Sequence, residues 1–374
     1  MSRARTVLLA IALALVSACA RETPYEWQLP PGFPQPLVPP DNALTMEKVE
    51  LGRHLFYDKR LSANGTQSCA SCHHQGHAFS EDAPTATGST GQHHHRNSMA
   101  LVNVAYTATF TWAHPGINTI EQHVLLPLFG DKPVEMGAAG HEQEIVARIR
   151  ADAAYDELFA RAFPSQGERV TFDHVAKALA SFVRTLVSFN SPFDRYAYYG
   201  EDSALTEAQV RGMNLFMSER LECAHCHAGF NFSQFVTHKS TKVAERAFHV
   251  TGLYPYSATY VSGADYGLFA VTGQEADKDR FKAPTLRNIE RSAPYMHDGS
   301  LATLSDVVDF YAAGGRVVTE GPRAGDGRAH PGKNPFIKGF TLSAQEKQDL
   351  LDFLSSLTDE RFLTDPRYGD PSTP

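Results

Sequence analysis

Two short stretches, Cys69-Ala-Ser-Cys-His73 and Cys223-Ala-His-Cys-His227, decide how this chain of 374 residues folds. In each, two cysteines lie three positions apart and a histidine follows directly. At this spacing the thiols can bond the two vinyl groups of a haem while the imidazole ligates its iron. The motifs therefore predict two covalently attached c-type haems. We expect attachment through Cys69, Cys72, Cys223 and Cys226, with His73 and His227 as axial ligands.

The C-x-x-C spacing also occurs in structural zinc sites and in disulfides. Zinc motifs do not require a histidine directly after the second cysteine, and here that histidine occurs twice. The chain has five cysteines, so only Cys19 lies outside the motifs and no disulfide framework is left to build. His225, inside the second motif, is interpreted as a variable residue.

The N-terminal residues have the pattern of an export signal. Arg3 and Arg5 precede an apolar run over residues 7–16 that is too short to span a bilayer as a mature helix. Val16-Ser-Ala-Cys19 resembles a bacterial lipobox, which predicts a lipoprotein signal peptide over residues 1–18 and lipidation of Cys19. An ordinary signal with an incidental cysteine is the alternative. We expect a periplasmic protein that is anchored to a membrane by lipid, because c-type haems in bacteria are also attached outside the cytoplasm.

Residues after the signal divide into a tether and two domains. The proline-rich stretch between Pro24 and Pro40 predicts an extended tether, assigned to residues 19–45. No later apolar run reaches transmembrane length, and a net charge of -8 gives no reason to expect nucleic acid as a partner. The remaining length suits two haem domains, an N-terminal one over residues 46–200 and a C-terminal one over residues 201–374.

Helical patterns dominate these two domains. Apolar residues recur at helical spacing, or follow N-cap residues, over residues 144–163, 172–187, 203–217 and 343–357. Few stretches alternate like strands, and proline and glycine are frequent between the helices. The sequence therefore predicts a mainly α fold of two cytochrome c-like haem domains with long loops.

Further blocks resemble the bacterial dihaem cytochrome c peroxidase and MauG family. They are Leu51-Gly-Arg-His-Leu-Phe56, Arg96-Asn97, Phe281-Lys-Ala-Pro-Thr-Leu-Arg-Asn288 and Ala293-Pro-Tyr-Met-His-Asp-Gly299. The resemblance implies a peroxide-reactive haem in the first domain and an electron-transfer haem in the second. Within the family, Leu29-Pro-Pro-Gly-Phe-Pro34, the lipobox and Phe362-Leu-Thr-Asp-Pro366 are most similar to MbnH-type proteins, which modify a partner protein.

The resemblance also points to the second axial ligand of the C-terminal haem. Fourteen positions after His297, the peroxidases of the family carry methionine and the MauG-like enzymes carry tyrosine; this chain has Tyr311. A phenolate is a hard anionic donor that stabilises oxidised iron, whereas a thioether favours the ferrous state. The alternative is that Tyr311 is a packing residue of a helix over residues 304–312. In that case the ligand would be one of Met296, Met213 and Met217.

On the first haem, the family leaves the face opposite His73 open to hydrogen peroxide. Splitting the O–O bond requires a group that moves a proton and a polar neighbour that orients the peroxide. Glu135 matches the distal acid of the family and Gln122 its distal amide, although either could be an ordinary surface residue. For His93, His94 and His95 we expect a solvated loop and name no ligand among them.

Two further assignments rest on the resemblance. Trp112 matches the tryptophan between the two haems, where an indole can pass an oxidising equivalent; a packing role is the alternative. Asn97, Ser292 and Pro294 match a calcium site built from oxygen ligands.

The leading functional hypothesis is an MbnH-like enzyme. It would use hydrogen peroxide to form a high-valent two-haem state that oxidises a partner protein, with conversion of tryptophan to kynurenine in a copper-binding MbnP-like partner as the candidate reaction. The alternative is a dihaem cytochrome c peroxidase that reduces peroxide to water with electrons from a cytochrome c or a cupredoxin. A third hypothesis is a protein that only transfers electrons. MauG carries a surface tryptophan where this chain has Leu221, so either the electron exit differs or there is no protein substrate.

Overall fold

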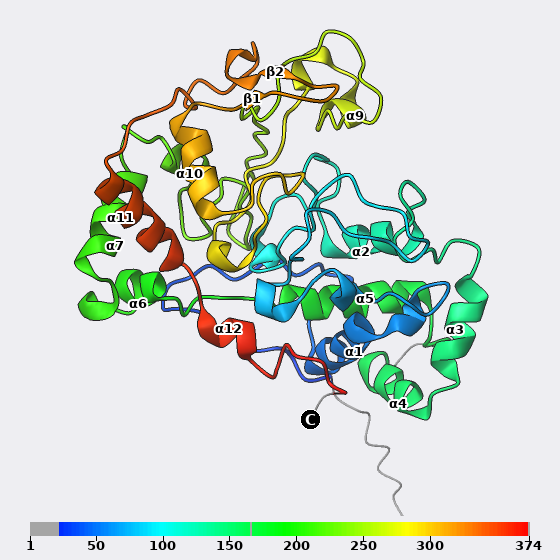
Figure 1. Ribbon diagram of the computed structural model, residues 1–374. Coiled ribbons are helices and arrows are strands. Elements are labelled where there is room, and N and C mark those ends of the chain that lie inside the picture. Colours follow the sequence, from blue (N-terminus) through cyan, green and yellow to red (C-terminus); the bar gives the residue numbers. More distant parts are fainter. Residues whose placement is uncertain (1–21, 165–166, 373–374) are drawn as a thin grey trace, which may run out of the picture.

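The structure is a computed structural model that describes residues 22–164 and 167–372. It is mainly α-helical, as predicted, with long loops between the helices (Figure 1). The α helices of this part of the chain are α1 (Met46–Tyr57), α2 (Ile120–Phe129), α3 (Glu142–Arg150), α4 (Ala153–Ala162), α5 (Phe172–Arg184), α6 (Pro192–Tyr198), α7 (Glu207–Phe216), α8 (Ala224–His227), α9 (Phe269–Thr272), α10 (Leu304–Ala312), α11 (Ala344–Ser355) and α12 (Glu360–Thr364). Cys19 and the signal peptide proposed around it lie outside the described residues.

Strand structure in these residues is limited to a small hairpin. Its strands, β1 (Val317–Val318) and β2 (Gly325–Asp326), pair antiparallel. Short 3₁₀ turns interrupt the loops at Lys59–Leu61, Cys69–Ser71, Gln75–His77, Val104–Tyr106, Asp202–Ala204, Glu275–Asp277, Ile289–Arg291 and Gly327–Ala329.

The helix predicted over residues 144–163 is two helices, α3 and α4. The break comes at Asp152, whose side chain accepts a hydrogen bond from the Ala154 amide at 3.0 Å and caps α4. Aspartate favours such caps because its carboxylate bonds free amides at a helix N-terminus. A new helix therefore begins at a point where apolar spacing alone predicted that one helix would continue.

Two pairs of helices cross closely at a glycine. They are α1 with α5 in the first half of the molecule, and α7 with α11 in the second half. Gly52 of α1 faces α5 so closely that a Cβ atom would lie 1.9 Å from the Ala178 carbonyl oxygen. Gly212 of α7 faces α11 in the same way, with 1.9 Å to the Asp349 carbonyl oxygen. Since no side chain fits at this distance, both helix pairs depend on glycine for their close approach. In both halves the helix that carries the glycine precedes the C-x-x-C-H motif in the chain.

Two separate hydrophobic clusters follow from these crossings. The first draws mainly on residues between Leu51 and Leu186, and the second on residues between Phe193 and Leu357. The end of the chain then returns to the first half: α12 runs back toward α1 (Figure 1), and Phe362 packs against Phe79 at 5.7 Å between ring centroids. Phe362 and its neighbours, which we placed with the second domain, therefore pack on the first cluster.

The segment predicted as a tether is packed over its described part, residues 22–45. The ring of Phe33 contacts Phe189 at 4.7 Å and Tyr198 at 4.6 Å, and the Tyr106 hydroxyl donates to the Pro34 carbonyl at 2.8 Å. The prediction of a free tether was therefore wrong here. Proline content suits an extended path, but Phe33 on that path is half-buried and is stabilised by packing against Phe189 and Tyr198.

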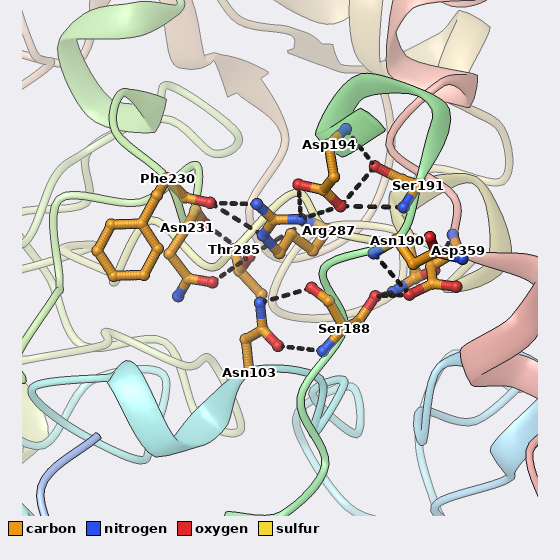
Figure 2. Close-up of polar contacts among 11 residues, drawn as sticks. Asn103, Ser188, Asn190, Ser191, Asp194, Phe230, Asn231, Thr285, Arg287 and Asp359 are labelled. Carbon is orange, nitrogen blue, oxygen red and sulfur yellow. Dashed lines mark hydrogen bonds and ion pairs between the residues drawn. The ribbon is translucent and has the colours of Figure 1, made fainter. Parts of the chain in front are cut away.

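A buried polar network joins the two halves (Figure 2). Arg287, fully buried, pairs with the buried Asp194 at 2.9 Å and donates to the Phe230 carbonyl. The Ser188 amide donates to the side-chain oxygen of Asn103 at 2.7 Å, and the Ser188 hydroxyl donates to Asp359 at 3.0 Å. The connection between α5 and α6 is thus held by residues from both halves. Within the described residues, no helix is long and apolar enough to span a bilayer.

Candidate haem cavity and active site

One cavity is lined by both C-x-x-C-H motifs. All four motif cysteines are free thiols, so the disulfide alternative is excluded. Among the described residues, the four thiols do not gather with His73 or His227 closely enough to hold a zinc ion. Burial raises the pKa of each thiol to about 11 or 12, so all four are neutral. Neutral thiols facing an apolar cavity fit covalent attachment of a large flat cofactor.

The two motif histidines are oriented by the same type of hydrogen bond. His73 Nδ1 lies 2.7 Å from the Phe79 carbonyl oxygen, and His227 Nδ1 lies 3.0 Å from the Phe232 carbonyl oxygen. Such a bond fixes the tautomer in which Nδ1 carries the proton and Nε2 is free to ligate a metal. Burial lowers the pKa of both histidines to about 4, which keeps the imidazoles neutral as ligation requires.

Backbone strain accompanies these two bonds. Phe79 has a φ of 60° and Phe232 a φ of 47°, in the left-handed region that bulky residues rarely adopt. Both phenylalanine side chains are completely buried. Strained residues of this kind persist only where the surrounding structure fixes them. Here the buried ring of each phenylalanine fixes the carbonyl that orients the haem-ligating histidine.

Tyr311, on α10, lies in the wall of the cavity beside the second motif. Burial raises its pKa, with further contributions from the nearby Cys226 and Cys223. Its hydroxyl makes no hydrogen bond to any of the described residues, which leaves the oxygen available to a metal. Met213 and Met217 do not line the cavity, and Met217 is 45% exposed. Of the four alternatives for the axial ligand, Tyr311 and Met296 remain in the cavity.

Glu135 lies in the cavity wall on the side of the first motif. Its carboxyl has a pKa raised to about 7 by burial, so it can both accept and release a proton near neutrality. Its Oε1 atom lies 3.6 Å from Nε2 of His94. The charge of Glu135 also raises the pKa of Cys69 and Cys72, which shows that it is close to the first pair of thiols. These positions suit a distal acid–base residue.

His94 departs from the solvated loop that we expected. His93 and His95 are exposed, but His94 lines the cavity, and its buried Nε2 has no hydrogen-bond partner among the described residues. Burial lowers the pKa of this imidazole, so it is neutral. The run of three histidines gave no signal to distinguish the one that points inward, because that choice depends on the fold of the loop.

Gln122 was wrongly assigned as the distal amide. It is exposed, and its Oε1 accepts from the Asn118 amide at 3.2 Å at the start of α2. The neighbouring His123 lines the cavity instead, with its pKa lowered to about 4 by burial and then by the nearby His73. The reason is helical phase: Ile120 and His123 are one turn apart on the inner face of α2. The helical spacing of Ile120 and His123 could have identified the inner face of α2 from the sequence. Matching single residues to the family did not use that spacing.

Trp112 also lines the cavity that the two motifs share. Its indole Nε1 donates to the Asn97 carbonyl at 2.9 Å, and its own carbonyl accepts from the Lys282 amide at 2.8 Å. The buried Lys282 ammonium donates to Thr107 and to the Thr109 carbonyl, and burial lowers its pKa to about 7. The tryptophan is thus held from both sides by hydrogen bonds.

The three residues expected at a calcium site all line the same cavity. Asn97 uses its side-chain nitrogen to donate to the Ala83 and Pro84 carbonyls, both at 3.2 Å. Its side-chain oxygen has no donor among the described residues. A free amide oxygen is the type of ligand that calcium takes, so the residues present fit the ion.

Leu221, at the position where MauG carries its surface tryptophan, is only 4% exposed and belongs to the second hydrophobic cluster. His225 lies close to the surface, stacked on Phe336 at 3.8 Å, and pairs with Glu222 at 2.7 Å. It does not line the cavity, which agrees with its interpretation as a variable residue of the motif.

Comparison with known proteins identifies this arrangement. Residues 46–203 match the di-haem cytochrome c peroxidase family. A cytochrome-c peroxidase of Pseudomonas sp. (strain SCT) is 34% identical over 92% of this chain and 89% of its own length. The methylamine utilization protein MauG of Methylorubrum extorquens is 34% identical over 86% of this chain and 81% of its own length.

A solved structure agrees with these relatives. The crystal structure of a MauG-like protein associated with microbial copper homeostasis has a TM-score of 0.89 and 46% identity, covering 93% of this chain and 99% of the other. Members of this family carry two c-type haems, which the free thiols and oriented histidines of the cavity fit. The chain therefore belongs to the dihaem cytochrome c peroxidase and MauG family and is a peroxidase-type oxidoreductase.

Proposed function

We propose that this enzyme uses hydrogen peroxide to oxidise a partner protein, as MauG-like enzymes do, through a high-valent state shared by two haems. The observation that carries this proposal is Tyr311, whose free hydroxyl belongs to the cavity wall beside the second pair of thiols. A phenolate ligand stabilises oxidised iron. It therefore suits a site that stores an oxidising equivalent until a large substrate arrives.

The protein's own residues have separate parts in this scheme. When bound, the haems supply the redox chemistry toward peroxide. On the first side, the Glu135 carboxyl takes a proton from peroxide and returns it to the leaving oxygen, which its pKa of about 7 permits. His94 and His123 are the neighbouring polar groups that can orient the peroxide in place of Gln122. Trp112, whose hydrogen bonds to the backbone of Asn97 and Lys282 fix it in the cavity wall, would pass oxidising equivalents between the two haems.

The partner we propose is a periplasmic copper-binding protein of the MbnP-like type, with a tryptophan that is converted to kynurenine. Support comes from the MauG-like protein associated with copper homeostasis, which is 46% identical to this chain. The sequence blocks that resemble MbnH-type proteins point the same way. A dihaem cytochrome c peroxidase is the second candidate, favoured by the 34% identity to the enzyme of Pseudomonas sp..

Export, lipidation at Cys19 and calcium binding are part of the same proposal. The first two rest on the N-terminal sequence. Calcium rests on Asn97, Ser292 and Pro294, and on the unpaired side-chain oxygen of Asn97. Mass spectrometry of the membrane-extracted protein and metal analysis of the purified protein would test them.

The decisive experiment adds peroxide to the dihaem protein without any reductant and follows near-infrared absorption. A long-lived charge-resonance band supports the proposal, and Tyr311→Phe should lose both the band and the low-spin spectrum of the second haem. Absence of the band, together with rapid peroxide-dependent oxidation of reduced cytochrome c, would establish the peroxidase instead. An unchanged spectrum in Tyr311→Phe would exclude Tyr311 as ligand. Incubation with a candidate copper-binding partner and mass analysis of its tryptophans identifies the product.

A further inference from the structure

A line of aromatic side chains leads from the cavity wall to the surface of the second half. Phe281 and His297 both line the cavity and are stacked at 3.7 Å between ring centroids. Behind them, the ring of Tyr254 meets His297 edge-on at 6.4 Å. The line also connects with Trp112. Phe281 directly precedes Lys282, and the Lys282 amide donates a hydrogen bond to the Trp112 carbonyl.

Tyr254 has the surroundings of a phenol that can be oxidised. Its hydroxyl donates to the Asp298 carboxylate at 2.6 Å, a short bond to a group that can accept the proton. Burial, followed by the bond to Asp298, raises the pKa of Tyr254, so the phenol holds its proton until an electron leaves. The guanidinium groups of Arg316 and Arg323 lie against its ring at 4.6 and 4.5 Å.

These two cations determine how the oxidation must occur. A positive charge left on the Tyr254 ring would be repelled by both guanidinium groups. Loss of the electron is therefore favourable only if the proton moves to Asp298 in the same step, which leaves a neutral phenoxyl radical. The geometry already provides the acceptor for that proton.

Two further tyrosines continue the line outward. Arg323 contacts Tyr266 at 5.2 Å as well as Tyr254, so the two rings share one guanidinium. Tyr266 is buried and lies 5.7 Å from Tyr260, which is 75% exposed. An aromatic ring that is this exposed at the end of a buried line is suited to contact with a large substrate. At the second motif, by contrast, the MauG tryptophan position is occupied by the buried Leu221.

We propose that Tyr254, Tyr266 and Tyr260 carry the oxidising equivalent from the cavity to the protein partner. Tyr254 gives one electron to the peroxide-oxidised cofactor and its phenolic proton to Asp298. It is restored by one electron from Tyr260 and by the return of that proton from Asp298; the ring of Tyr266 bridges the two tyrosines and is not itself oxidised. Tyr260, which is exposed, releases its phenolic proton to water and regains it when the partner supplies one electron. This inference rests on the proposed function, since it requires hydrogen peroxide as oxidant and a macromolecular reductant.

The test uses the full dihaem protein, one equivalent of hydrogen peroxide and no partner. Freeze-quenched samples are examined by electron paramagnetic resonance, with ring-deuterated tyrosine to identify a tyrosyl radical, while near-infrared absorption is followed in parallel. We expect a tyrosyl signal in the parent protein and its loss in Tyr254→Phe, in which the near-infrared band should also decay more slowly. Asp298→Asn, which keeps the tyrosine but removes the base, should slow radical formation about 100-fold or more.

Tyr256→Phe is the matched control. Tyr256 also donates to a carboxylate at 2.6 Å, that of Glu275, but its ring contacts His330 rather than a residue of the cavity wall. It should behave as the parent protein does. A tyrosyl signal that is absent from the parent, or unchanged in Tyr254→Phe, would overturn the inference. Absence of the near-infrared band with a Tyr254-dependent radical would instead overturn the shared high-valent state and leave the tyrosine route standing.

Discussion

The two haem motifs are supported in the same way but face different surroundings. In both halves a glycine in the helix before the motif lets two helices cross closely, and a buried phenylalanine with positive φ orients the motif histidine. On the first side the cavity wall carries Glu135 and His94, groups that can exchange protons. On the second side it carries Tyr311, which we propose as the second axial ligand of that haem.

This difference shows that attachment and reactivity are separate features of the molecule. The motif and its neighbouring turn hold the cofactor and the proximal histidine. The residues that we propose for the opposite face of each haem come from elements distant in the sequence, the loop after α2 for Glu135 and α10 for Tyr311. The same motif and turn could therefore occur twice in one chain. In the proposed function, one copy would serve a haem that reacts with peroxide and the other a haem that stores an oxidising equivalent.

Glu135→Gln should have the largest effect of the changes considered, because it removes the proton-exchanging group found only on the first side. Without a carboxyl to move the proton, the second-order rate of reaction with peroxide should fall about 100- to 10,000-fold. Stopped-flow spectroscopy measures this rate, and absorption spectra check that both haems remain bound. Tyr311→Phe serves as the comparison, because it should change the second haem's spectrum first. An unchanged peroxide rate in Glu135→Gln would remove this residue from the mechanism.

Arg287→Met tests how firmly α6 is held within the second half. The change leaves the buried Asp194 carboxylate without its partner, which should lower the free energy of unfolding by about 3–5 kcal/mol. Denaturant titration followed by circular dichroism gives the value. Arg328→Met, which removes an exposed surface pair with Asp326, should cost far less, because solvent screens that pair. Equal losses in the two variants would show that the buried pair does not stabilise the second half.

Substitution of the two crossing glycines tests whether the halves are structurally equivalent. Gly52→Ala and Gly212→Ala each place a methyl group 1.9 Å from a backbone oxygen, so the helices must separate. We expect a loss of about 1–3 kcal/mol in unfolding free energy from each. Thermal and denaturant unfolding would measure both. Gly76→Ala is a suitable control, because a methyl group at this position would have no other atom within 4 Å; a similar loss there would contradict the explanation.

The pH dependence of the peroxide reaction should show the smallest change in rate, but it tests Glu135 most directly. With a pKa of about 7, Glu135 is mostly protonated at pH 6 and mostly ionised at pH 8. Since the ionised form accepts the proton, the rate should rise about tenfold between these values and then level off. Glu135→Gln should show a flat profile over this range, whereas Tyr311→Phe should keep the slope. A rate that falls with rising pH would show that the acid form is required instead.

The amino-acid sequence by itself determined the attachment chemistry and the fold class. Covalent haem attachment depends on a spacing of three positions along the chain, which local geometry alone fixes. Apolar periodicity likewise predicted the mainly helical architecture. The family resemblance pointed to Tyr311 by its position fourteen residues after His297, and the structure places Tyr311 in the cavity wall.

Only the tertiary structure decided which polar groups face the cavity and where the chain ends pack. His123 rather than Gln122 points inward because of the phase of α2, and His94 rather than its neighbours because of a loop that no periodicity describes. The line from His297 through Tyr254 to Tyr260 brings together residues from separate loops. The proline-rich N-terminal segment packs between the halves, since burial of Phe33 requires a surface that exists only once both halves have folded.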